Sequence, residues 1–307
     1  MIFVILGTQR IPFVRLLKSV DSLIESQIIY DEVIAQSGHT EYDARNFRCV
    51  PFLSEEEFQD YIDKASVIIT HSGSGSIFSA LKKKKKVIAV ARLKENGEMQ
   101  DNHQTELVYK LSKEGMILDG SDSLEAAWNK LKTFEPVFDT VKCEIPNIIK
   151  PIFEGRNNVM LVCNKGGHYS ELMSLKSCWN GIAAPWMVTD KHDACLDFGN
   201  NFLEFEAFNY SRKRYRAFIG NVCYALRLCR ELRPDYVIST GAGIAVPLFI
   251  VAKLFGAKLV FIESRARVYS KSRAGRLLYP LCDVFLVQWP EMLEVYGKKA
   301  LYMGTIS

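Results

Sequence analysis

The sequence lacks the patterns that mark secreted, membrane-spanning and metal-dependent proteins. Its eight cysteines form no CxxC pair and no disulfide-like spacing, which predicts buried, reduced thiols in the cytosol. The apolar segment 1–6 is too short for a signal peptide and has no basic residues before it. No apolar run reaches the roughly 18–20 residues that a spanning helix needs. No Asp-x-Asp motif and no cluster with metal-ligand spacing occurs, so we predict neither a metal nor a cofactor.

The net charge of +4 is unevenly distributed along the chain. Residues 1–150 hold 19 Lys and Arg against 22 Asp and Glu, whereas residues 151–307 hold 20 against 13, a balance of +7. A basic second half favours an anionic partner, either a membrane surface or a phosphorylated ligand, and is equally typical of an ordinary basic surface. Nucleic acid is not predicted as a partner, because no binding motif accompanies the charge.

Apolar runs alternate with helical patterns through both halves of the chain, and the segment 134–157 between them contains three prolines. Such alternation predicts an α/β fold in which helices cover parallel sheets. We expect two Rossmann-like doubly wound domains, 1–133 and 158–307, joined by a linker or crossover segment at 134–157. The predicted strands are 2–6, 28–34, 47–50, 66–70, 87–91, 116–118, 158–163, 185–189, 236–239, 258–262 and 283–287. The predicted helices are 13–25, 54–63, 77–86, 101–113, 122–132, 169–178, 211–232, 244–255 and 290–296.

Six loops follow directly after predicted strands. In doubly wound folds, ligands bind at the carboxyl ends of the strands. We therefore expect the six loops to lie on one side of the molecule, at a cleft between the domains. They are 6–10, 71–76, 92–104, 163–168, 239–243 and 263–265.

The segment 71–76, His-Ser-Gly-Ser-Gly-Ser, lies between an apolar run and a predicted helix. Its glycines let the backbone approach a phosphate, and the N–H groups at a helix N-terminus favour negative charge. The segment 92–104 follows the next apolar run and offers polar side chains suited to hydroxyl groups. Together the two loops predict binding of a nucleotide-sugar, whereas the first loop alone is also typical of an ordinary tight turn.

Several separate motifs resemble one family of enzymes. The second half resembles the membrane-associated acceptor subunit of the split N-acetylglucosaminyltransferase of N-glycan assembly, and more closely its bacterial capsule and exopolysaccharide counterparts, at 164–172, 238–243, 262–268 and 287–291. The first half resembles the donor-binding catalytic subunit of the same pair at 7–13, 71–76, Arg92, 97–98 and 101–104. Together the halves resemble MurG-like glycosyltransferases of family 28. The resemblance implies the GT-B fold, in which two Rossmann-like domains face a cleft.

Two features depart from the family pattern. The donor-binding half comes first, so the chain resembles a fused or permuted version of a normally split enzyme. Ser79 stands near the position where MurG-like enzymes have a ribose-binding glutamate. No ribose carboxylate is therefore predicted.

The resemblance implies two binding sites. The UDP-sugar donor is expected to bind Gly7, Thr8, Gln9, Arg10, His71, Ser72, Gly73, Ser74, Gly75, Ser76, Arg92, Asp101, Asn102, His103 and Gln104. The acceptor is expected to bind Lys165, Gly166, Gly167, Glu171, Thr240, Gly241, Gly243 and Arg265. Two donor-site roles stay open. His71 is either a charge partner of the diphosphate or a packed histidine, and Arg92 either faces the diphosphate or is a surface arginine.

Two residues are candidates for the catalytic general base. His168 follows a Gly-Gly turn, and an ordinary imidazole with a pKa of about 6.5 suits proton abstraction at neutral pH. Alternatively, His168 is structural and its loop binds the pyrophosphate of the acceptor. Glu263 ends a predicted buried strand, and its alternative role is an ion pair with Arg265 or Arg267.

These observations predict an inverting, metal-independent glycosyltransferase, peripherally associated with the cytoplasmic face of the plasma membrane. An amphipathic segment at 211–233 and the basic residues at 265–276 predict the membrane-facing surface. By the resemblance, the enzyme moves a sugar, galactose in β-1,4 linkage as first choice, from a UDP-sugar to a polyprenyl-diphosphate-linked saccharide of the glucosyl-diphospho-undecaprenol type, in capsule or exopolysaccharide synthesis. UDP-N-acetylglucosamine and UDP-glucuronate are alternative donors. A soluble nucleotide-sugar epimerase of the same fold and a non-catalytic scaffold are alternative functions, and a homodimer formed by swapping halves is a further possibility.

Overall fold

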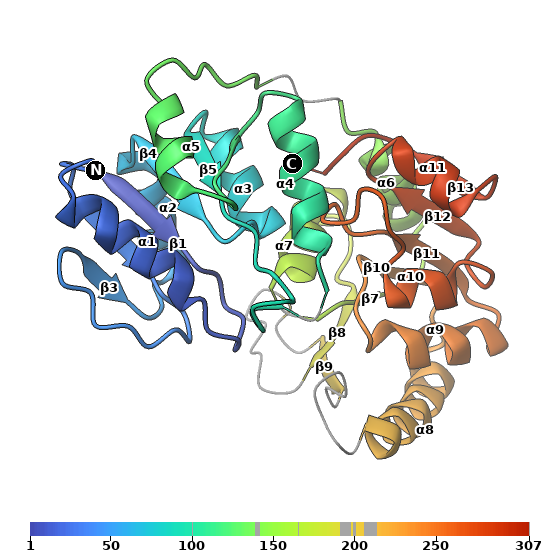
Figure 1. The fold of residues 1–307 in the computed structure, drawn as a ribbon. Helices are drawn as coiled ribbons and strands as arrows, with labels where there is room; N and C mark the ends of the chain where they lie inside the picture. The colour runs from blue at the N-terminus through green and yellow to red at the C-terminus, as the bar shows by residue number, and fades with distance from the viewer. Residues whose placement is uncertain are drawn as a thin grey trace. The chain divides into compact units, whose positions relative to one another are not determined.

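The computed structural model describes residues 1–99, 101–138, 142–164, 166–190, 198, 201–205 and 214–306. The chain divides into two units, Met1–Thr140 and Val141–Ser307. Each unit contains one β-sheet whose neighbouring strands all run parallel (Figure 1).

The sheet of the first unit has six strands in the order β3-β2-β1-β4-β5-β6. Because the chain moves outward from β1 to β3 and then returns to the other side of β1, the strand order reverses between β1 and β4. The strands are β1 (Ile2–Ile5), β2 (Val33–Gln36), β3 (Arg48–Val50), β4 (Val67–Thr70), β5 (Lys86–Ala89) and β6 (Leu118–Asp119). The helices are α1 (Val14–Glu25), α2 (Glu55–Lys64), α3 (Ser74–Lys82), α4 (His103–Lys113) and α5 (Leu124–Lys130).

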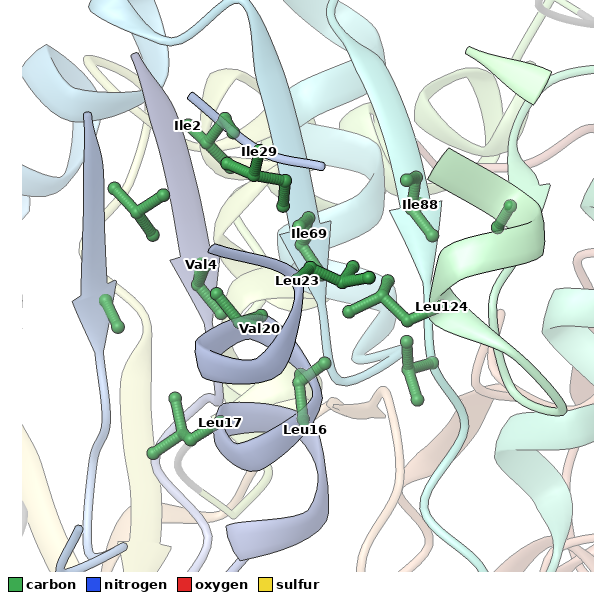
Figure 2. Packing of buried hydrophobic residues seen from close by; sticks show 14 of the residues in the cluster. Ile2, Val4, Leu16, Leu17, Val20, Leu23, Ile29, Ile69, Ile88 and Leu124 are labelled. Carbon is green, nitrogen blue, oxygen red and sulfur yellow. The ribbon is translucent and has the colours of Figure 1, made fainter. Parts of the chain in front are cut away.

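The largest core of this unit lies between the sheet and helices α1 and α5 (Figure 2). Leu16 and Val20, one turn apart on α1, are buried in it together with Val4 of β1. On the opposite face, Phe3 packs against Phe58 of α2 with ring centroids 5.6 Å apart. Successive residues of a strand point to opposite faces, so the wholly apolar β1 is covered on both sides.

The sheet of the second unit has seven strands in the order β13-β12-β11-β10-β7-β8-β9. Its strand order reverses between β7 and β10. The strands are β7 (Val159–Val162), β8 (Trp186–Asp190), β9 (Phe202–Phe205), β10 (Tyr236–Ser239), β11 (Lys258–Ile262), β12 (Val284–Val287) and β13 (Ala300–Tyr302). The helices are α6 (Ile145–Glu154), α7 (Gly167–Met173), the short η1 (Lys176–Cys178), α8 (Arg214–Leu232), α9 (Ala245–Leu254), α10 (Arg273–Leu278) and α11 (Glu291–Tyr296).

Helices cover both faces of this second sheet. Phe153 of α6 and Leu172 of α7 are buried against Leu161 on one face. Phe249 of α9 packs against Phe261 on the other face, with ring centroids 6.1 Å apart. The predicted fold class, two Rossmann-like doubly wound α/β domains, is therefore confirmed.

The segment expected to be a linker or crossover, 134–157, includes the boundary between the two units and, after it, helix α6. Ile145, Ile149 and Ile152 recur at helical spacing and are buried in the core of the second unit. Pro146 lies in the first turn of α6, where no backbone N–H is needed. The prolines suggested a break in structure, whereas the apolar period identifies a helix that belongs to the second unit.

Other predicted boundaries also moved. The strand expected at 28–34 is β2 at Val33–Gln36, because the N–H groups of Ile28 and Ile29 donate to the Leu23 carbonyl and complete the end of α1. The helix expected at 77–86 is α3, which begins three residues earlier, inside the Gly/Ser segment. Elements β9, α10 and β13 were not predicted. Among the described residues, no helix combines the length and apolar content needed to cross a membrane.

Candidate functional site

Four of the six loops chosen from the sequence lie at the points where the strand order reverses, whereas the loops 92–104 and 263–265 follow the next strands outward, β5 and β11. In the first unit, the Gly7 loop follows β1 and the His71 loop follows β4, and these strands are neighbours. In the second unit, the His168 loop follows β7 and the Thr240 loop follows β10, which are also neighbours. All strands within a sheet are parallel, so the two loops of each pair lie at the same edge of their sheet. Reversal points of this kind are where doubly wound folds bind ligands.

His71 is a packed, neutral histidine. The ring Nδ1 of His71 lies 3.0 Å from the Ile5 carbonyl oxygen, and the backbone N–H of His71 donates to the same oxygen at 2.9 Å. Burial and, to a smaller extent, the nearby positive charge of Arg92 lower the pKa of His71 to about 3. The burial of the ring and its contact with the Ile5 carbonyl agree with a packed histidine, and contact of His71 with a diphosphate stays a prediction.

The glycines around His71 leave room for its ring. A Cβ on Gly7 would lie 2.5 Å from His71 Nε2, and a Cβ on Gly73 would lie 2.3 Å from the same atom. Gly7 also has a φ of 73°, which favours glycine. A Cβ on Gly38, after β2, would lie 2.3 Å from the Gly7 carbonyl oxygen. Three loops therefore meet at close backbone distance around one imidazole.

The N-terminus of α3 presents backbone donors beside this ring. The first bond of the helix runs from Ile77 N–H to the Gly73 carbonyl at 3.1 Å, so the amides of Ser74, Gly75 and Ser76 precede the intrahelical pattern. Ser72 has a φ of 65°, and its buried hydroxyl has no hydrogen-bond partner within the ranges described. Donors in this arrangement, with the positive end of the helix dipole, suit an anion.

Arg92 is buried, so the alternative of a surface arginine is wrong. Its guanidinium donates to the backbone carbonyls of Leu6 at 3.0 Å and Ile11 at 2.6 Å. It also stacks 4.7 Å from the ring centroid of Phe13. Burial lowers the pKa of Arg92 to about 10, so it stays charged at neutral pH. Arg92 therefore holds the loop after β1 in place and puts a buried positive charge next to that loop.

The polar residues after β5 mostly stabilise their own loop. Asp101 accepts a hydrogen bond from the His103 ring Nδ1. Asn102 Oδ1 accepts from Lys94 N–H at 2.9 Å, and Gln104 Oε1 accepts from Arg92 N–H at 3.1 Å. The half-buried pair of Asp101 and His103 is therefore the part of this segment best placed to meet a sugar hydroxyl. Of the remaining donor-site candidates, Thr8 and Arg10 are exposed and Gln9 is half-buried.

His168 and Thr240 hold each other across the reversal point of the second sheet. His168 Nδ1 lies 2.8 Å from the Thr240 carbonyl oxygen, and the Thr240 hydroxyl donates to the His168 carbonyl at 2.7 Å. A carbonyl only accepts, so Nδ1 carries the hydrogen and Nε2 of the neutral ring is unprotonated. A Cβ on Gly241, whose φ is 121°, would lie 2.9 Å from the His168 ring. This geometry orients an imidazole with a basic Nε2.

Glu263 is a structural carboxylate. It is almost wholly buried and accepts hydrogen bonds from Ser264 N–H at 2.9 Å, Ser272 N–H at 3.2 Å and the Tyr296 hydroxyl. The alternative role for Glu263 was an ion pair with Arg265 or Arg267, and Arg265 lies beside Glu171 instead. A carboxylate so enclosed holds the loops after β11, so of the two candidates for the general base we carry the half-buried His168 forward as the proposal.

Glu171 and Arg265 were expected to bind the acceptor, and both are buried. Arg265 Nε lies 3.5 Å from Glu171 Oε1, the Ser264 hydroxyl donates to the same oxygen at 3.0 Å, and Arg265 Nη1 donates to the Ile306 carbonyl at 2.7 Å. Burial raises the pKa of Glu171 to about 7. These two residues join α7 to the loop after β11, and their predicted contact with the acceptor stays a prediction.

The remaining acceptor candidates occupy the two loops at the reversal point. Gly166 has a φ of 91° and precedes α7, and Gly167 is the first, exposed residue of that helix. Gly243 is half-buried in the loop after β10. Lys165 lies outside the described residues.

The sequence analysis missed three features of the first unit. The loop after β2 reaches the site through Gly38, and Thr40 Oγ1 accepts the Phe13 N–H at 3.0 Å. The exposed His39 stacks edge-on with Phe52, the ring centroids 5.0 Å apart. Arg15 clamps Glu98 through two bonds of 3.0 Å. The sequence did contain a signal for the loop after β2, because Ser-Gly-His-Thr at 37–40 follows an apolar run. The predicted strand, 28–34, ends before the observed β2 does, so these residues were not recognised as a loop at a strand end.

Comparisons with known proteins support this division of the chain. Residues 1–135 match the family model described as glycosyltransferase family 28 C-terminal domain. Residues 212–306 match the model described as oligosaccharide biosynthesis protein Alg14 like. The two halves of the chain are therefore similar to a family 28 C-terminal domain and to an Alg14-like protein, in that order.

Individual relatives agree with the two family models. UDP-N-acetylglucosamine transferase subunit ALG14 of Rattus norvegicus is 27% identical over 178 residues, which cover 48% of this chain and 82% of the relative. The structure of MurG from Acinetobacter baumannii is 15% identical, with a TM-score of 0.42, over 49% of this chain and 46% of that one. The solution structure of ALG13 is 19% identical, with a TM-score of 0.32, over 44% of this chain and 86% of that one. The strand orders, rather than these low scores, establish the fold.

Proposed function

We propose that this chain is a glycosyltransferase that moves a sugar from a UDP-sugar to a lipid-diphosphate-linked saccharide. The first unit binds the donor and the second binds the acceptor. The family 28 match to residues 1–135 and the Alg14-like match to residues 212–306 support this assignment.

The observation that carries the proposal is the N-terminus of α3. The amides of Ser74, Gly75 and Ser76 lie outside the intrahelical pattern, and the approach of Gly7 and Gly73 to His71 excludes side chains from the loops beside them. Such a surface of backbone donors suits the UDP diphosphate. The charge on Arg92, held beneath the neighbouring loop, favours the negative charge that collects on UDP as it leaves.

His168 is the general base in this proposal. With its Nδ1–H donated to Thr240, its Nε2 accepts the proton of the acceptor hydroxyl. The hydroxyl oxygen then forms a bond to C1 of the donor sugar, and the bond from C1 to the diphosphate oxygen breaks with its electron pair leaving on UDP. A single displacement inverts the configuration at C1, so an α-linked donor gives a β-linked product.

The donor sugar we place first is N-acetylglucosamine. The curated relatives are named as UDP-N-acetylglucosamine transferase subunits, and their names refer neither to galactose nor to capsule synthesis. Galactose, the first choice from the sequence, and glucuronic acid therefore rank behind it. No described residue reads the C4 or C6 substituent of the sugar in a way that decides among the three.

The acceptor is proposed to be lipid-linked, which places the enzyme peripherally on a membrane. The basic second half of the chain supports this location, as do exposed arginines on α8 such as Arg216, Arg227 and Arg230. The proposed reaction is metal-independent and needs no cofactor. A half-swapped homodimer remains a separate prediction.

The test is release of UDP from UDP-N-acetylglucosamine, UDP-galactose and UDP-glucuronate, each with and without a diphosphate-lipid acceptor, in the presence of EDTA. Acceptor-dependent release from one donor is the expected result. Loss of release in EDTA that Mg²⁺ restores would contradict the metal-independent mechanism. Release without acceptor would indicate an epimerase or a hydrolase, and UDP binding without turnover would indicate a scaffold.

A further inference from the structure

A cavity of about 640 Å³ lies at the end of the second sheet opposite His168. Tyr236 and Lys258, the first residues of β10 and β11, line it, whereas Thr240 follows the carboxyl end of β10. The cavity is therefore distinct from the proposed acceptor site. Its other lining residues are Asn157, Cys229, Arg230, Arg233, Pro234, Asp235, Phe255 and Gly256.

Positive charge exceeds negative charge around this cavity. The side chains of Arg230, Arg233 and Lys258 are exposed, and within the described residues none of them forms an ion pair. The lone lining carboxylate, Asp235, accepts a hydrogen bond from Asn158 N–H at 2.7 Å. The ends of α8 and α9 add about half a negative charge each, which leaves the cations in excess. Burial raises the pKa of the Cys229 thiol to about 11, so it adds no charge.

Exposed apolar side chains border the same cavity. Phe255, which lines it, is 46% exposed, and the neighbouring Leu254 is 78% exposed. Ile250 lies one turn earlier on α9, and Leu226 lies on α8, which packs beside α9 (Figure 1); both are also exposed. Cations around a recess with apolar side chains at its rim suit a phosphate that carries acyl chains.

We propose that this cavity binds the headgroup phosphate of an anionic membrane lipid. Arg230, Arg233 and Lys258 contact the phosphate, while Leu254 and Phe255 enter the interface among the acyl chains. The ligand is a structural lipid rather than the glycosyl acceptor, because the cavity lies at the opposite end of β10 from His168. The proposal rests on the membrane location proposed above, but not on glycosyl transfer.

The experiment is cosedimentation of the full chain with phosphatidylcholine vesicles, with and without phosphatidylglycerol. Neutralising the three cations in R230Q/R233Q/K258Q is expected to lower the partition coefficient for phosphatidylglycerol vesicles by about tenfold or more, since each cation near an anionic surface contributes about 1 kcal/mol. The matched control K82Q/K84Q/K113Q removes the same charge from exposed positions of the first unit and is expected to change binding less than about threefold.

The exposed apolar side chains are tested by a second pair of variants. L254Q is expected to weaken vesicle binding more than Y30Q, which changes an equally exposed apolar residue of the first unit.

Each other outcome has a defined meaning. Equal losses in the two triple variants would show that overall charge, and not the cavity, attracts the vesicles, which overturns the proposal. Cavity-dependent binding of soluble glycerol 3-phosphate without any binding to vesicles would overturn the lipid assignment. Because cosedimentation needs no sugar donor, vesicle binding through the cavity by a chain that transfers no sugar contradicts the proposed function alone. Transfer in detergent by a chain that binds no vesicles contradicts the cavity alone.

Discussion

Each unit places a histidine at the point where its strand order reverses, and the two histidines are held differently. Both rings lie where the strand order reverses, both have Nδ1 close to a backbone carbonyl oxygen, and both lie against a glycine of the neighbouring loop. His71 is buried, and two glycines approach its Nε2, whereas His168 is half-buried and Gly241 approaches the Nδ1 side of its ring. The His71 ring therefore supports a backbone surface, and the His168 ring is the one that we propose as the general base.

The difference teaches that a residue type at a reversal point does not by itself define a role. Burial decides which chemistry remains. A ring whose pKa is lowered to about 3 is a neutral spacer at any physiological pH. A ring with the same Nδ1 partner and access to solvent keeps the ability to accept a proton.

The largest expected effect comes from removing the base. His168→Asn should lower kcat by about 10²–10⁴-fold, the range for loss of a positioned general base. UDP binding, measured by calorimetry, should be unchanged, because donor contacts are assigned to the other unit. Ser170→Ala, an exposed neighbour on α7, is the matched control and should retain activity. Full activity in His168→Asn would remove the proposed distinction between the two histidines.

The second effect is a pH dependence of opposite sign in the two units. The pKa of His71 falls from 6.5 to about 3 on folding, so its contribution to the stability of the first unit is complete above pH 6.5 and is lost as the pH falls toward 3. The pKa of Glu171 rises from 4.5 to about 7, so its contribution to the second unit is complete below pH 4.5 and is lost as the pH rises to 7. Each loss is expected to be roughly 2–5 kcal/mol.

Hydrogen exchange read by mass spectrometry measures this dependence separately in the two units. His71→Gln should flatten the acid-side dependence of the first unit without altering the second. Glu171→Gln should flatten the dependence of the second unit between pH 4.5 and 7. If the stability of both units of the unmodified chain changed with pH in the same direction, the buried base His71 and the buried acid Glu171 could not both have the assigned effects.

A third prediction concerns the space that the glycines leave for His71. Gly73→Ala places a methyl group 2.3 Å from Nε2 and should destabilise the first unit by about 1–3 kcal/mol, with a matching loss of UDP affinity. Because the clash is with one ring, His71→Ala should remove most of the additional cost of Gly73→Ala in a double-mutant cycle. Gly220→Ala is the control for replacing a glycine without a clash, since Gly220, like Gly73, has no positive φ and nothing lies within 4 Å of its added Cβ. Additive effects of the Gly73 and His71 changes would contradict the steric account.

The sequence predicted the architecture and the site loops because both depend on local patterns. Apolar runs with the length of strands, separated by helical periods, were sufficient to place the parallel sheets, and the small residues after β4 marked the start of α3. The second strand was placed too early because Ile28 and Ile29 form an apolar pair that completes α1, and this error hid the loop with Gly38 and His39. The apolar character of two neighbouring residues does not show whether they end the preceding helix or begin the following strand.

The direction of polar side chains could not be predicted in the same way. Arg92 and Arg265 follow strand ends and Glu171 lies on the short helix α7, and in each place a side chain can point to solvent or inward, so tertiary partners decide which. One signal was available for Glu171. It lies on α7 next to the buried Leu172, and the buried Leu175 follows four residues later, just beyond the helix. A charged residue on a buried stripe needs a partner, and Arg265 supplies it.

The smallest effect concerns the loop that receives the Nδ1–H of His168. Ala242 follows Gly241 with a φ of 85°, a conformation that L-residues rarely adopt and that costs about 1 kcal/mol or more. Ala242→Gly relieves that strain but adds freedom to the unfolded chain, so stability should rise by no more than about 1 kcal/mol. The loop position should not move, because the mutual hydrogen bonds of Thr240 and His168 remain. Denaturant unfolding together with kcat measures both. A fall in kcat at unchanged stability would mean that the strained Ala242, and not the hydrogen bonds between Thr240 and His168 alone, holds His168 in position. His168 would then depend on its neighbouring loop as fully as His71 does.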